Sequence, residues 1–307
     1  MRQIDELAEI IDRHVPAEGM HPSILPRLSL IRSCRPTEAV PSVYRPSLCI
    51  IAQGRKQVEL GGRSYVYDPA KYLLVSVDLP LVGSILEASL ERPYLCLALD
   101  IDLPALSDLI QQSAPEPAPQ SMGQPMGQPM GPALGVSQVE PGLLDAALRL
   151  ARLLDTPADA PALAPLAERE ILYRLLSGAQ APMIRHIAAA ESRLAKVSRA
   201  IAWLRRHYAQ PVSVERLAAE AGMSPSSFHS HFKAATTLSP LQYRTRVRLQ
   251  EARRMMVVEA MDAASAGFAV GYESPSQFSR DYSRLYGAPP LKDANRLRGS
   301  PDYSLVA

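Results

Sequence analysis

Two short segments, fifty residues apart, carry the side chains of this chain that are best suited to recognising another molecule. In the first segment the polar side chains at helical spacing are Ser226, His229, Ser230 and Lys233. In the second they are Ser276, Ser279, Arg280 and Ser283, with Gln277 at the rim. Positions three and four residues apart share one face of a helix, and short hydrogen-bonding side chains with an arginine can reach base edges in the major groove. The two segments therefore predict a pair of DNA-reading helices.

The two segments belong to an internal repeat. Its equivalent positions, at a constant offset of fifty, are Phe228 and Phe278, Phe232 and Tyr282, and Pro240 and Pro290. Each copy has a helix, a turn with Gly and a second helix that begins at Ser-Pro, which is the pattern of a helix-turn-helix unit. We place the units at about 214–236 and 262–286, with helices at 197–208, 214–221 and 225–236. The aromatic pair of each second helix is expected to be buried.

A long helix is predicted at 240–258, between the two units. It spans roughly 28 Å at about 1.5 Å per residue, against the ~34 Å between successive major grooves on one face of DNA. Its arginines are Arg244, Arg246, Arg248, Arg253 and Arg254. Either they pair within the helix, for example with Glu251, or some of them contact phosphates, which we expect because one glutamate cannot neutralise five arginines. Two further short helices are expected beyond residue 258.

The charge of the chain is divided unevenly between its two halves. Residues 1–180 hold 15 Lys and Arg against 21 Asp and Glu, whereas residues 181–307 hold 18 against 10. The formal net charge of +2 therefore conceals −6 in the first half and +8 in the second. A basic, arginine-rich half beside an acidic half favours a polyanion-binding module joined to a domain of another kind.

Short apolar runs separated by turn residues predict that the first half is a β-domain. Strands are expected at 48–52, 56–60, 64–67, 72–77, 81–86 and 94–99. Gly61-Gly62 suits a two-residue hairpin turn, and Asp102 suits the N-cap of a helix at 103–110. Several short strands at near-regular spacing indicate a small sandwich or barrel. For a chain of 307 residues we expect two domains, at 1–190 and 191–300.

The segment 115–132 has too little apolar bulk to order itself. Six of its 18 residues are Pro, and the motif MGQP occurs twice. We therefore expect a disordered insert near 113–135. Apolar stripes at helical spacing then predict amphipathic helices over 143–154 and 168–176. These stripes either pack on their own domain or form a dimer seam, and we favour the seam and a homodimer.

The sequence contains no cluster suited to a metal or to covalent catalysis, so we expect no catalytic residue, no metal and no cofactor. No His lies between His21 and His186, which leaves the β-domain without imidazole ligands. The cysteines, Cys34, Cys49 and Cys96, are too widely spaced for a disulfide framework or a CxxC zinc site, and they favour a reduced, cytoplasmic protein. Cys49 and Cys96 are either inert core residues or reactive thiols. No apolar run reaches the roughly 18 residues that span a bilayer, so no membrane partner is expected.

Over about residues 195–298 the chain resembles the AraC/XylS family of bacterial transcription regulators. The resemblance rests on SPLQYRTRVRLQEARR at 239–254 and VGYESPSQFSR at 270–280. It implies an all-α domain of two helix-turn-helix units, joined by a long helix, that binds adjacent major grooves of double-stranded DNA. By matching position, the DNA contacts would be Ser226, Ser227, His229, Ser230, Lys233, Ser276, Gln277, Ser279, Arg280 and Arg284. The family usually has a β-branched residue followed by Ala where this chain has Ala266-Gly267, so we expect a less rigid second unit.

The first half resembles the amino-terminal domain of one AraC-type subgroup. The motifs are SLCIIAQG at 47–54 and YLLVSVDLP at 72–80. This resemblance implies a cupin-like β-barrel followed by helices, which binds an effector and often dimerises. The whole chain is then an α+β protein of two domains and a ligand-responsive transcription regulator. Its expected partners are DNA, RNA polymerase, an unknown small-molecule effector and a second copy of the chain.

Three other functions share some of these features. A cupin-type enzyme with an appended DNA-binding module is the main alternative, although the missing His cluster argues against its metal-dependent forms. A DNA-repair methyl acceptor needs a zinc-bound Cys cluster, and the cysteines of this chain are not paired in sequence. An architectural DNA binder without regulation would leave the sensory β-domain unexplained.

Overall fold

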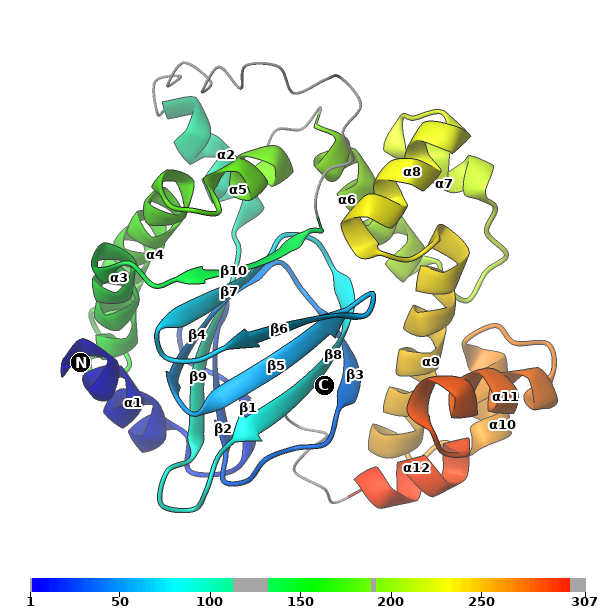
Figure 1. Cartoon of the computed structure of the whole chain (residues 1–307), viewed down its shortest axis with the longest axis horizontal. Coiled ribbons are helices and arrows are strands. Elements are labelled where there is room, and N and C mark those ends of the chain that lie inside the picture. The colour runs from blue at the N-terminus through cyan, green and yellow to red at the C-terminus, as the bar shows by residue number, and fades with distance from the viewer. Residues whose placement is uncertain (1, 113–131, 189–191, 299–307) are drawn as a thin grey trace.

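A computed structural model describes residues 2–112, 132–188 and 192–298 of the chain. A β-rich half lies between two groups of helices, with helices α1, α3 and α4 on one side and helices α6 to α12 on the other (Figure 1). Residues 113–131 of the expected insert lie outside the described residues, while residues 132 and 133 lead directly into strand β10. Within the described ranges, no helix combines the length and the apolar character that crossing a membrane requires.

The β-domain consists of two facing antiparallel sheets. The larger sheet has the order β1 (Gly19–Pro22), β2 (Leu28–Ser33), β9 (Tyr94–Asp100), β4 (Ser47–Gln53), β7 (Lys71–Val75) and β10 (Leu134–Gln138). The smaller sheet has the order β3 (Val40–Tyr44), β8 (Leu79–Glu87), β5 (Arg55–Leu60) and β6 (Arg63–Tyr67). No strand pairing between the sheets is present in the part of the chain that is described. The expected cupin-like barrel is therefore open, with two sheets in place of one closed sheet.

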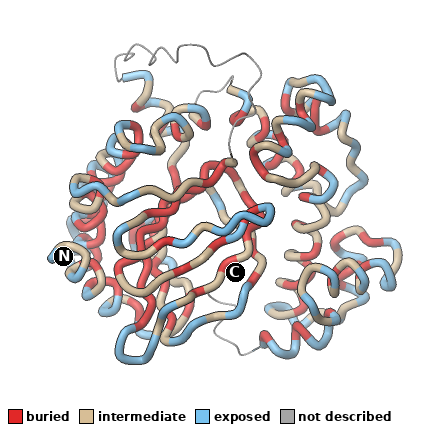
Figure 2. Tube along the Cα trace, in the orientation of Figure 1, coloured by how far each residue is buried: buried red, intermediate tan, exposed pale blue. Residues whose placement is uncertain are grey.

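The six predicted strands are confirmed as β4 to β9, whereas β1, β2, β3 and β10 were not predicted. β1 and β3 are edge strands that contain Pro22 and Pro41, and proline is tolerated at an edge because only one side of the strand needs a partner. The prolines hide the strand pattern in the sequence. β4 is buried on both faces (Figure 2), one of them covered by α1, which explains its continuous apolar run. Gly61 and Gly62, at φ +57° and +80°, make the predicted hairpin turn between β5 and β6.

In the described part of the first half, the sheets are accompanied by the helices α1 (Arg2–His14), α2 (Leu103–Gln112), α3 (Pro141–Arg152), α4 (Ala160–Ser177) and α5 (Ala181–Ala188). The Oδ1 of Asp102 accepts the N–H of Ala105 at 3.0 Å, so the predicted cap of α2 is confirmed. The apolar stripe of α3, which includes Leu143 and Leu148, is buried against α1 and α4 of the same chain. The interpretation of this stripe as a dimer seam is therefore wrong, because α1, which no sequence pattern predicted, helps to cover it.

Within residues 192–298 the second half contains the helices α6 (Arg193–Arg206), α7 (Val214–Ala221), α8 (Pro225–Thr236), α9 (Pro240–Val258), α10 (Ala263–Ala269), α11 (Pro275–Tyr286) and α12 (Pro290–Leu297). α7, α8 and α9 have the predicted bounds, and Ser213 caps α7 as expected. Three helices follow α9 rather than the two expected. Pro290 begins α12 as Pro240 begins α9, so the repeat extends one helix further than its aromatic positions suggested.

Two apolar cores lie along α9. Tyr243, near its start, packs edge-on against Phe232 of α8 in a core that is continuous with that of the β-domain. Leu249, further along, belongs to a separate core with Phe278 and Tyr282 of α11. One rigid helix therefore contributes to the interior beneath both second helices of the repeat.

A buried ion pair holds the second core. Arg253 of α9 donates from Nε to Oδ2 of Asp293 at 2.8 Å and from Nη2 to Oδ1 at 3.1 Å. The Tyr282 hydroxyl donates to the same carboxylate at 2.8 Å, and both charged side chains are at most 5% exposed. Burial alone would raise the pKa of Asp293, but the hydrogen bonds and charge of Arg253 outweigh it and hold the pKa below its ordinary value. The carboxylate thus joins α9, α11 and α12.

We expect Asp293→Asn to lower the stability of the second unit at pH 7 by about 3–5 kcal/mol, because it leaves Arg253 buried without its counter-charge. A depressed pKa contributes stability above the unfolded value of about 3.9, and this is lost as pH falls through the folded value. The difference from the wild-type chain should therefore shrink below about pH 4. Thermal unfolding between pH 3 and pH 7 measures it.

Tyr282→Phe is the matched control, since it removes one hydrogen bond to the same carboxylate and costs about 1 kcal/mol. An Asp293→Asn deficit that stays constant across this pH range would contradict the role of the charged pair.

Candidate nucleic-acid interface and interdomain cavity

The way α8 begins, and what it buries, determine which of its sides faces outward. The hydroxyl of Ser224 caps the helix by accepting the N–H of Ser227 at 3.4 Å. The rings of Phe228 and Phe232, 5.3 Å apart between centroids, are fully buried on one side. The opposite side is the α8 face, which consists of exposed Ser226, His229, Ser230 and Lys233 and half-buried Ser227. The structure thus brings the five predicted residues of the first unit together on one surface.

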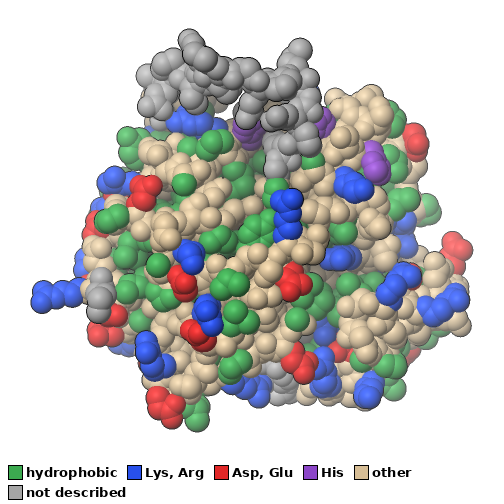
Figure 3. Space-filling view, in the orientation of Figure 1, with side chains coloured by type: hydrophobic (Ala, Val, Ile, Leu, Met, Phe, Trp, Pro, Cys, Tyr) green, Lys and Arg blue, Asp and Glu red, His purple; other side chains and the backbone are tan. Residues whose placement is uncertain are grey.

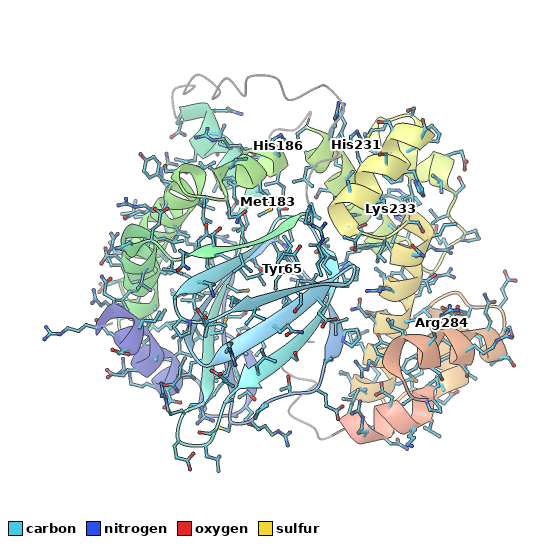
Figure 4. The ribbon with its side chains drawn as sticks, viewed as in Figure 1. Tyr65, Met183, His186, His231, Lys233 and Arg284 are labelled. Atoms are coloured by element: carbon cyan, nitrogen blue, oxygen red, sulfur yellow. The ribbon has the colours of Figure 1, made fainter. Side chains whose placement is uncertain are left out.

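α11 is positioned in the same way. Ser274 accepts the N–H of Gln277 at 3.4 Å, and the rings of Phe278 and Tyr282, with centroids 5.5 Å apart, are fully buried. The α11 face consists of exposed Ser276, Gln277, Arg280 and Arg284 and half-buried Ser279. Lys233 of the α8 face and Arg284 of the α11 face lie on separate helix groups (Figure 4), and Figure 3 shows Lys and Arg side chains on the surface over the second half.

The two arginines of the α11 face differ in their surroundings. Arg284 is 78% exposed and pairs with Asp281 at 2.5 Å. Arg280 is exposed and joins none of the ion pairs found among the described residues, so the alternative pair with Glu273 is not formed. Its guanidinium is left available to another molecule.

Gly267 packs closely against the aromatic core of the second unit, and the expected lower rigidity of this unit stays a prediction. A Cβ at this position would lie 3.0 Å from Cγ of Phe278. Because Phe278 is the buried ring that orients the α11 face, the glycine lets α10 approach that ring closely. The departure from the family pattern is therefore part of how the second unit is assembled.

The arginines in the middle of α9 bind backbone carbonyls just beyond the end of α6. Arg244 donates from Nε to the carbonyl oxygen of Tyr208 at 3.0 Å. Arg248 donates from Nε to the same oxygen at 2.7 Å and from Nη2 to that of Ala209 at 2.8 Å. Burial lowers the pKa of Arg248 to about 10. These side chains fasten α9 to α6 and are not free to reach phosphates.

The remaining arginines of α9 are also engaged, so the expected phosphate contacts from this helix are wrong. Arg246 donates to the carbonyl oxygen of Pro80 at 3.5 Å, and Arg253 is held by Asp293. Arg254 pairs with Glu251 at 2.6 Å and with Glu259 at 2.8 Å. Counting acidic residues within the helix missed these partners, because most of them are carbonyls or lie outside the helix.

Asp78, between β7 and β8, joins the two halves of the molecule. Its Oδ1 accepts from Nη1 of Arg205, on α6, at 2.7 Å. Its carbonyl oxygen accepts from the hydroxyl of Tyr243, on α9, at 2.9 Å. Burial raises the pKa of Tyr243 well above its usual value, which keeps the phenol protonated as the donor.

A second contact lies at the end of α8. Thr237 ends the helix at φ +62°. Gly61, at the tip of the β5–β6 hairpin, packs so closely on it that an added Cβ would overlap Cβ of Thr237, at 2.5 Å. The N–H of Ala133 donates to the carbonyl oxygen of Ala235 at 3.1 Å. The first helix-turn-helix unit is thus packed on the β-domain at both α8 and α9.

A cavity of about 600 Å³, which we call the interdomain cavity, lies between the two sheets and α9. Both halves line it, including Tyr44 from β3 and Gln250 from α9. Lys56 of β5 lines it too and is 5% exposed. Its Nζ lies 5.4 Å from the ring centroid of Tyr44 and 5.9 Å from that of Tyr94, where aromatic faces stabilise a cation.

Sequence reasoning missed Lys56, although the sequence carries a signal for it. Lys56, Val58 and Leu60 alternate along β5 and share its buried face. A lysine at an inward position of an alternating strand indicates a buried cation.

Cys49 and Cys96 also line the interdomain cavity. In the β4–β9 register Cys49 pairs with Ala98 and Ile51 with Cys96, so the two thiols are diagonal neighbours. A hydrogen bond with Cys96, aided by the charge of Lys56 and opposed by burial, holds the pKa of the Cys49 thiol below its ordinary value. Burial raises the pKa of Cys96 well above it. Across the described ranges, no three His, Cys, Asp or Glu side chains are grouped for a metal ion.

Comparisons with known families match both halves. Residues 24–183 match the model of the AraC-type transcriptional regulator N-terminus, and residues 217–296 match that of a helix-turn-helix domain. The transcriptional activator RhaS of Klebsiella pneumoniae (strain 342) is 30% identical over 128 residues, which cover 41% of this chain and 45% of RhaS. The MmsAB operon regulatory protein of Pseudomonas aeruginosa is 32% identical over 97 residues, 32% of each protein. The chain thus spans about half or less of the length of these curated relatives.

A likeness of fold extends over most of the chain. ToxT from Vibrio cholerae O395, in a crystal structure bound to (E)-4-(8-methylnaphthalen-1-yl)but-3-enoic acid, superposes with a TM-score of 0.59. The match covers 88% of this chain and 98% of ToxT at 10% sequence identity. At that identity the likeness concerns the fold alone.

We expect Asp78→Ala to loosen α9 from the β-domain, because it removes the ion pair to Arg205. A partly exposed pair of this kind contributes up to about 1 kcal/mol. Backbone hydrogen exchange of α9 and α6 should become faster while exchange in β2 and β9 stays unchanged. Hydrogen-exchange mass spectrometry of the whole chain measures this.

Asp68→Ala is the matched control, since Asp68 pairs at 3.3 Å with Lys71 of its own domain. Equal effects of the two substitutions on α9 would contradict a specific role for Asp78.

Proposed function

The chain belongs to the family of AraC-type transcriptional regulators, and we propose that it is a sequence-specific DNA-binding regulator that responds to a small molecule. One observation carries the proposal: the α8 face and the α11 face project from units built on a single helix, α9. Its 19 residues span roughly 28 Å at about 1.5 Å per residue. Successive major grooves lie about 34 Å apart, so the two faces are suited to adjacent grooves.

Within this function the residues of the two faces take different roles. Ser226, Ser227, His229 and Ser230 would contact base edges in one groove. Ser276, Gln277, Ser279 and Arg280 would do so in the next. Lys233 and Arg284, a turn further along their helices, are suited to the phosphate backbone. The support is the exposure of these side chains opposite buried aromatic pairs.

The interdomain cavity is the proposed effector site. Its volume, about 600 Å³, lies within the range typical of small-molecule pockets. Residues of α9 line it, so an occupant would touch the helix that carries both DNA-reading units. The binding of a small organic molecule by ToxT, a protein of similar fold, supports this assignment.

The other partners follow from the family. We propose contact with RNA polymerase, action in the cytoplasm, and a homodimer whose seam uses a surface other than the α3 stripe. The outer side of α4 offers Leu163, Leu166 and Tyr173, all exposed.

The alternative of a cupin-type enzyme with a DNA-binding module is disfavoured, because the matched relatives are named as regulators.

The test of DNA binding uses the whole chain and a random pool of duplex DNA. Repeated selection should enrich a bipartite site whose halves are separated by about one helical turn. The logarithm of the binding constant should then fall linearly with the logarithm of salt concentration, because bound cations release counterions. If no sequence is enriched, the proposed function fails.

On the selected site, Arg280→Ala should reduce specificity more than Lys233→Ala does. A guanidinium that makes two parallel bonds to guanine contributes about 1–3 kcal/mol of discrimination, whereas a phosphate contact acts on all sequences alike. Titration against selected and scrambled DNA at one salt concentration separates the two effects. Arg280→Ala should bring the affinities for selected and scrambled DNA closer together. Lys233→Ala should weaken binding to both DNAs and leave the ratio of the two affinities unchanged.

Melting temperatures measured beside these titrations act as the control. Arg280 joins no ion pair within residues 2–112, 132–188 and 192–298, so Arg280→Ala should melt as the wild-type chain does. A lowered melting temperature or an unchanged affinity ratio would show that Arg280 is not a base-reading residue.

A further inference from the structure

Building on the proposed function, we propose that the interdomain cavity binds a small monocarboxylic acid. Its carboxylate pairs with the ammonium group of Lys56 and accepts a hydrogen bond from the hydroxyl of Tyr44. Its apolar body extends toward α9.

Among the described residues that line the cavity, Lys56 is the buried cation that has no acidic partner, whereas Arg45, which also lines it, is exposed. Its side chain is almost fully buried, and it takes part in no ion pair among the described residues. The other basic side chains from α6 and α9 that line the cavity are paired: Arg205 with Asp78, Arg253 with Asp293, and Arg254 with Glu251. The two aromatic rings beside Lys56 stabilise its charge but do not neutralise it. A buried charge without a partner is costly, so an anion at this point is strongly favoured.

The acidic groups of the cavity do not supply this partner. Glu251 is occupied by Arg254. Asp100 lies four residues beyond Cys96 on β9, about 13 Å along the strand at ~3.3 Å per residue. The charges of Arg45 and Arg27 act on Asp100 and lower its pKa, although burial, the larger effect, leaves it raised. The buried wall of the cavity therefore carries one positive charge without an ion-pair partner among the described residues, that of Lys56, which matches a monoanion.

The hydrogen-bonding groups near Lys56 favour a carboxylate. Among the described residues, the hydroxyl oxygens of Tyr44 and Ser42 are buried without a geometrically formed hydrogen bond, and both residues line the cavity. The Tyr44 hydroxyl lies close enough to the ammonium group of Lys56 to help raise the pKa of Lys56 against the effect of burial. Gly83 leaves room at this point, because a Cβ there would lie 2.5 Å from the Tyr44 hydroxyl oxygen. One ammonium group and two hydroxyl donors match the two oxygens of a carboxylate.

The rest of the cavity supplies an apolar wall and a contact with α9. Ile31 and Val43 come from the β-domain, and Val247 comes from α9. At the α9 side, Oε1 of Gln250 and Nη1 of Arg253 are buried without partners. A ligand that fills the cavity thus contacts both halves of the molecule. If the ligand binds one position of α9 relative to the β-domain more tightly than another, its binding shifts the population toward that position.

The probes are straight-chain acids from butanoate to decanoate, together with benzoate and 1-naphthoate, each compared with its primary amide. An amide keeps the shape of the acid and removes its charge. Calorimetric titration of the whole chain at pH 7.5 should show binding of at least one acid, with its amide weaker by about tenfold or more, or 1.4 kcal/mol. Lys56→Met should abolish this preference and, without ligand, should melt no earlier than the wild-type chain.

Lys71→Met is the matched control, since Lys71 lies in the same domain and pairs with Asp68 outside the cavity. It should keep the preference for the acid. Gly83→Ala, which retains Lys56, tests the same place independently and should weaken binding of the same acid by about tenfold. If Lys56→Met does not fold, the result for Gly83→Ala decides.

Three results would overturn the inference: no acid of the series binds, the amides bind as tightly as the acids, or both cavity variants bind the acid as the wild-type chain does. The DNA selection on the same preparation separates the two proposals. DNA binding without acid binding removes only this inference, whereas loss of DNA binding removes the proposed function itself.

Discussion

The geometry of both DNA-reading faces depends on one helix, α9. Tyr243 near its start packs under α8, and Leu249 packs in the core under α11. A continuous helix is rigid over this length. The two faces are therefore held in a fixed relation to each other as long as both stay packed on α9. The buried pair of Arg253 and Asp293 then adds α12 to the same assembly. The separation of the two faces is thus a property of backbone geometry, and their orientation is a property of the two cores.

The two helix-turn-helix units are not equivalent in their attachment. The core of the first unit is continuous with that of the β-domain, and Asp78 and Gly61 fasten it there. The second unit has a core of its own and is joined to the rest of the chain through α9 and through the ion pair of Arg296, on α12, with Glu38 of the β-domain.

The arginines of the second half show why charge and function must be separated. Five of them lie on α9, and each is bound to a carbonyl or carboxylate of the same chain. Their guanidinium groups hold the helix in place, since their several donors can satisfy carbonyls at the ends of other elements. The basic side chains on the two DNA-reading faces are fewer, namely Lys233 of α8 and Arg280 and Arg284 of α11. The basic net charge of this half thus overstates the number of phosphate contacts.

The sequence by itself determined the local features of this protein. Helix bounds at α7, α8 and α9, the buried aromatic pairs and the outward polar faces follow from spacing, caps and proline positions, which act within a few residues. The six strands with alternating or continuous apolar runs were predicted for the same reason. Only the tertiary structure decided features that depend on partners far away in the chain. These features are the proline-containing edge strands β1 and β3, the burial of the α3 stripe by α1, the carbonyl partners of Arg244 and Arg248, and the packing of Gly267 on Phe278. The unpaired charge of Lys56 in the interdomain cavity belongs to the same class, because a lone lysine is recognised only when every neighbouring acid is found to be occupied or distant.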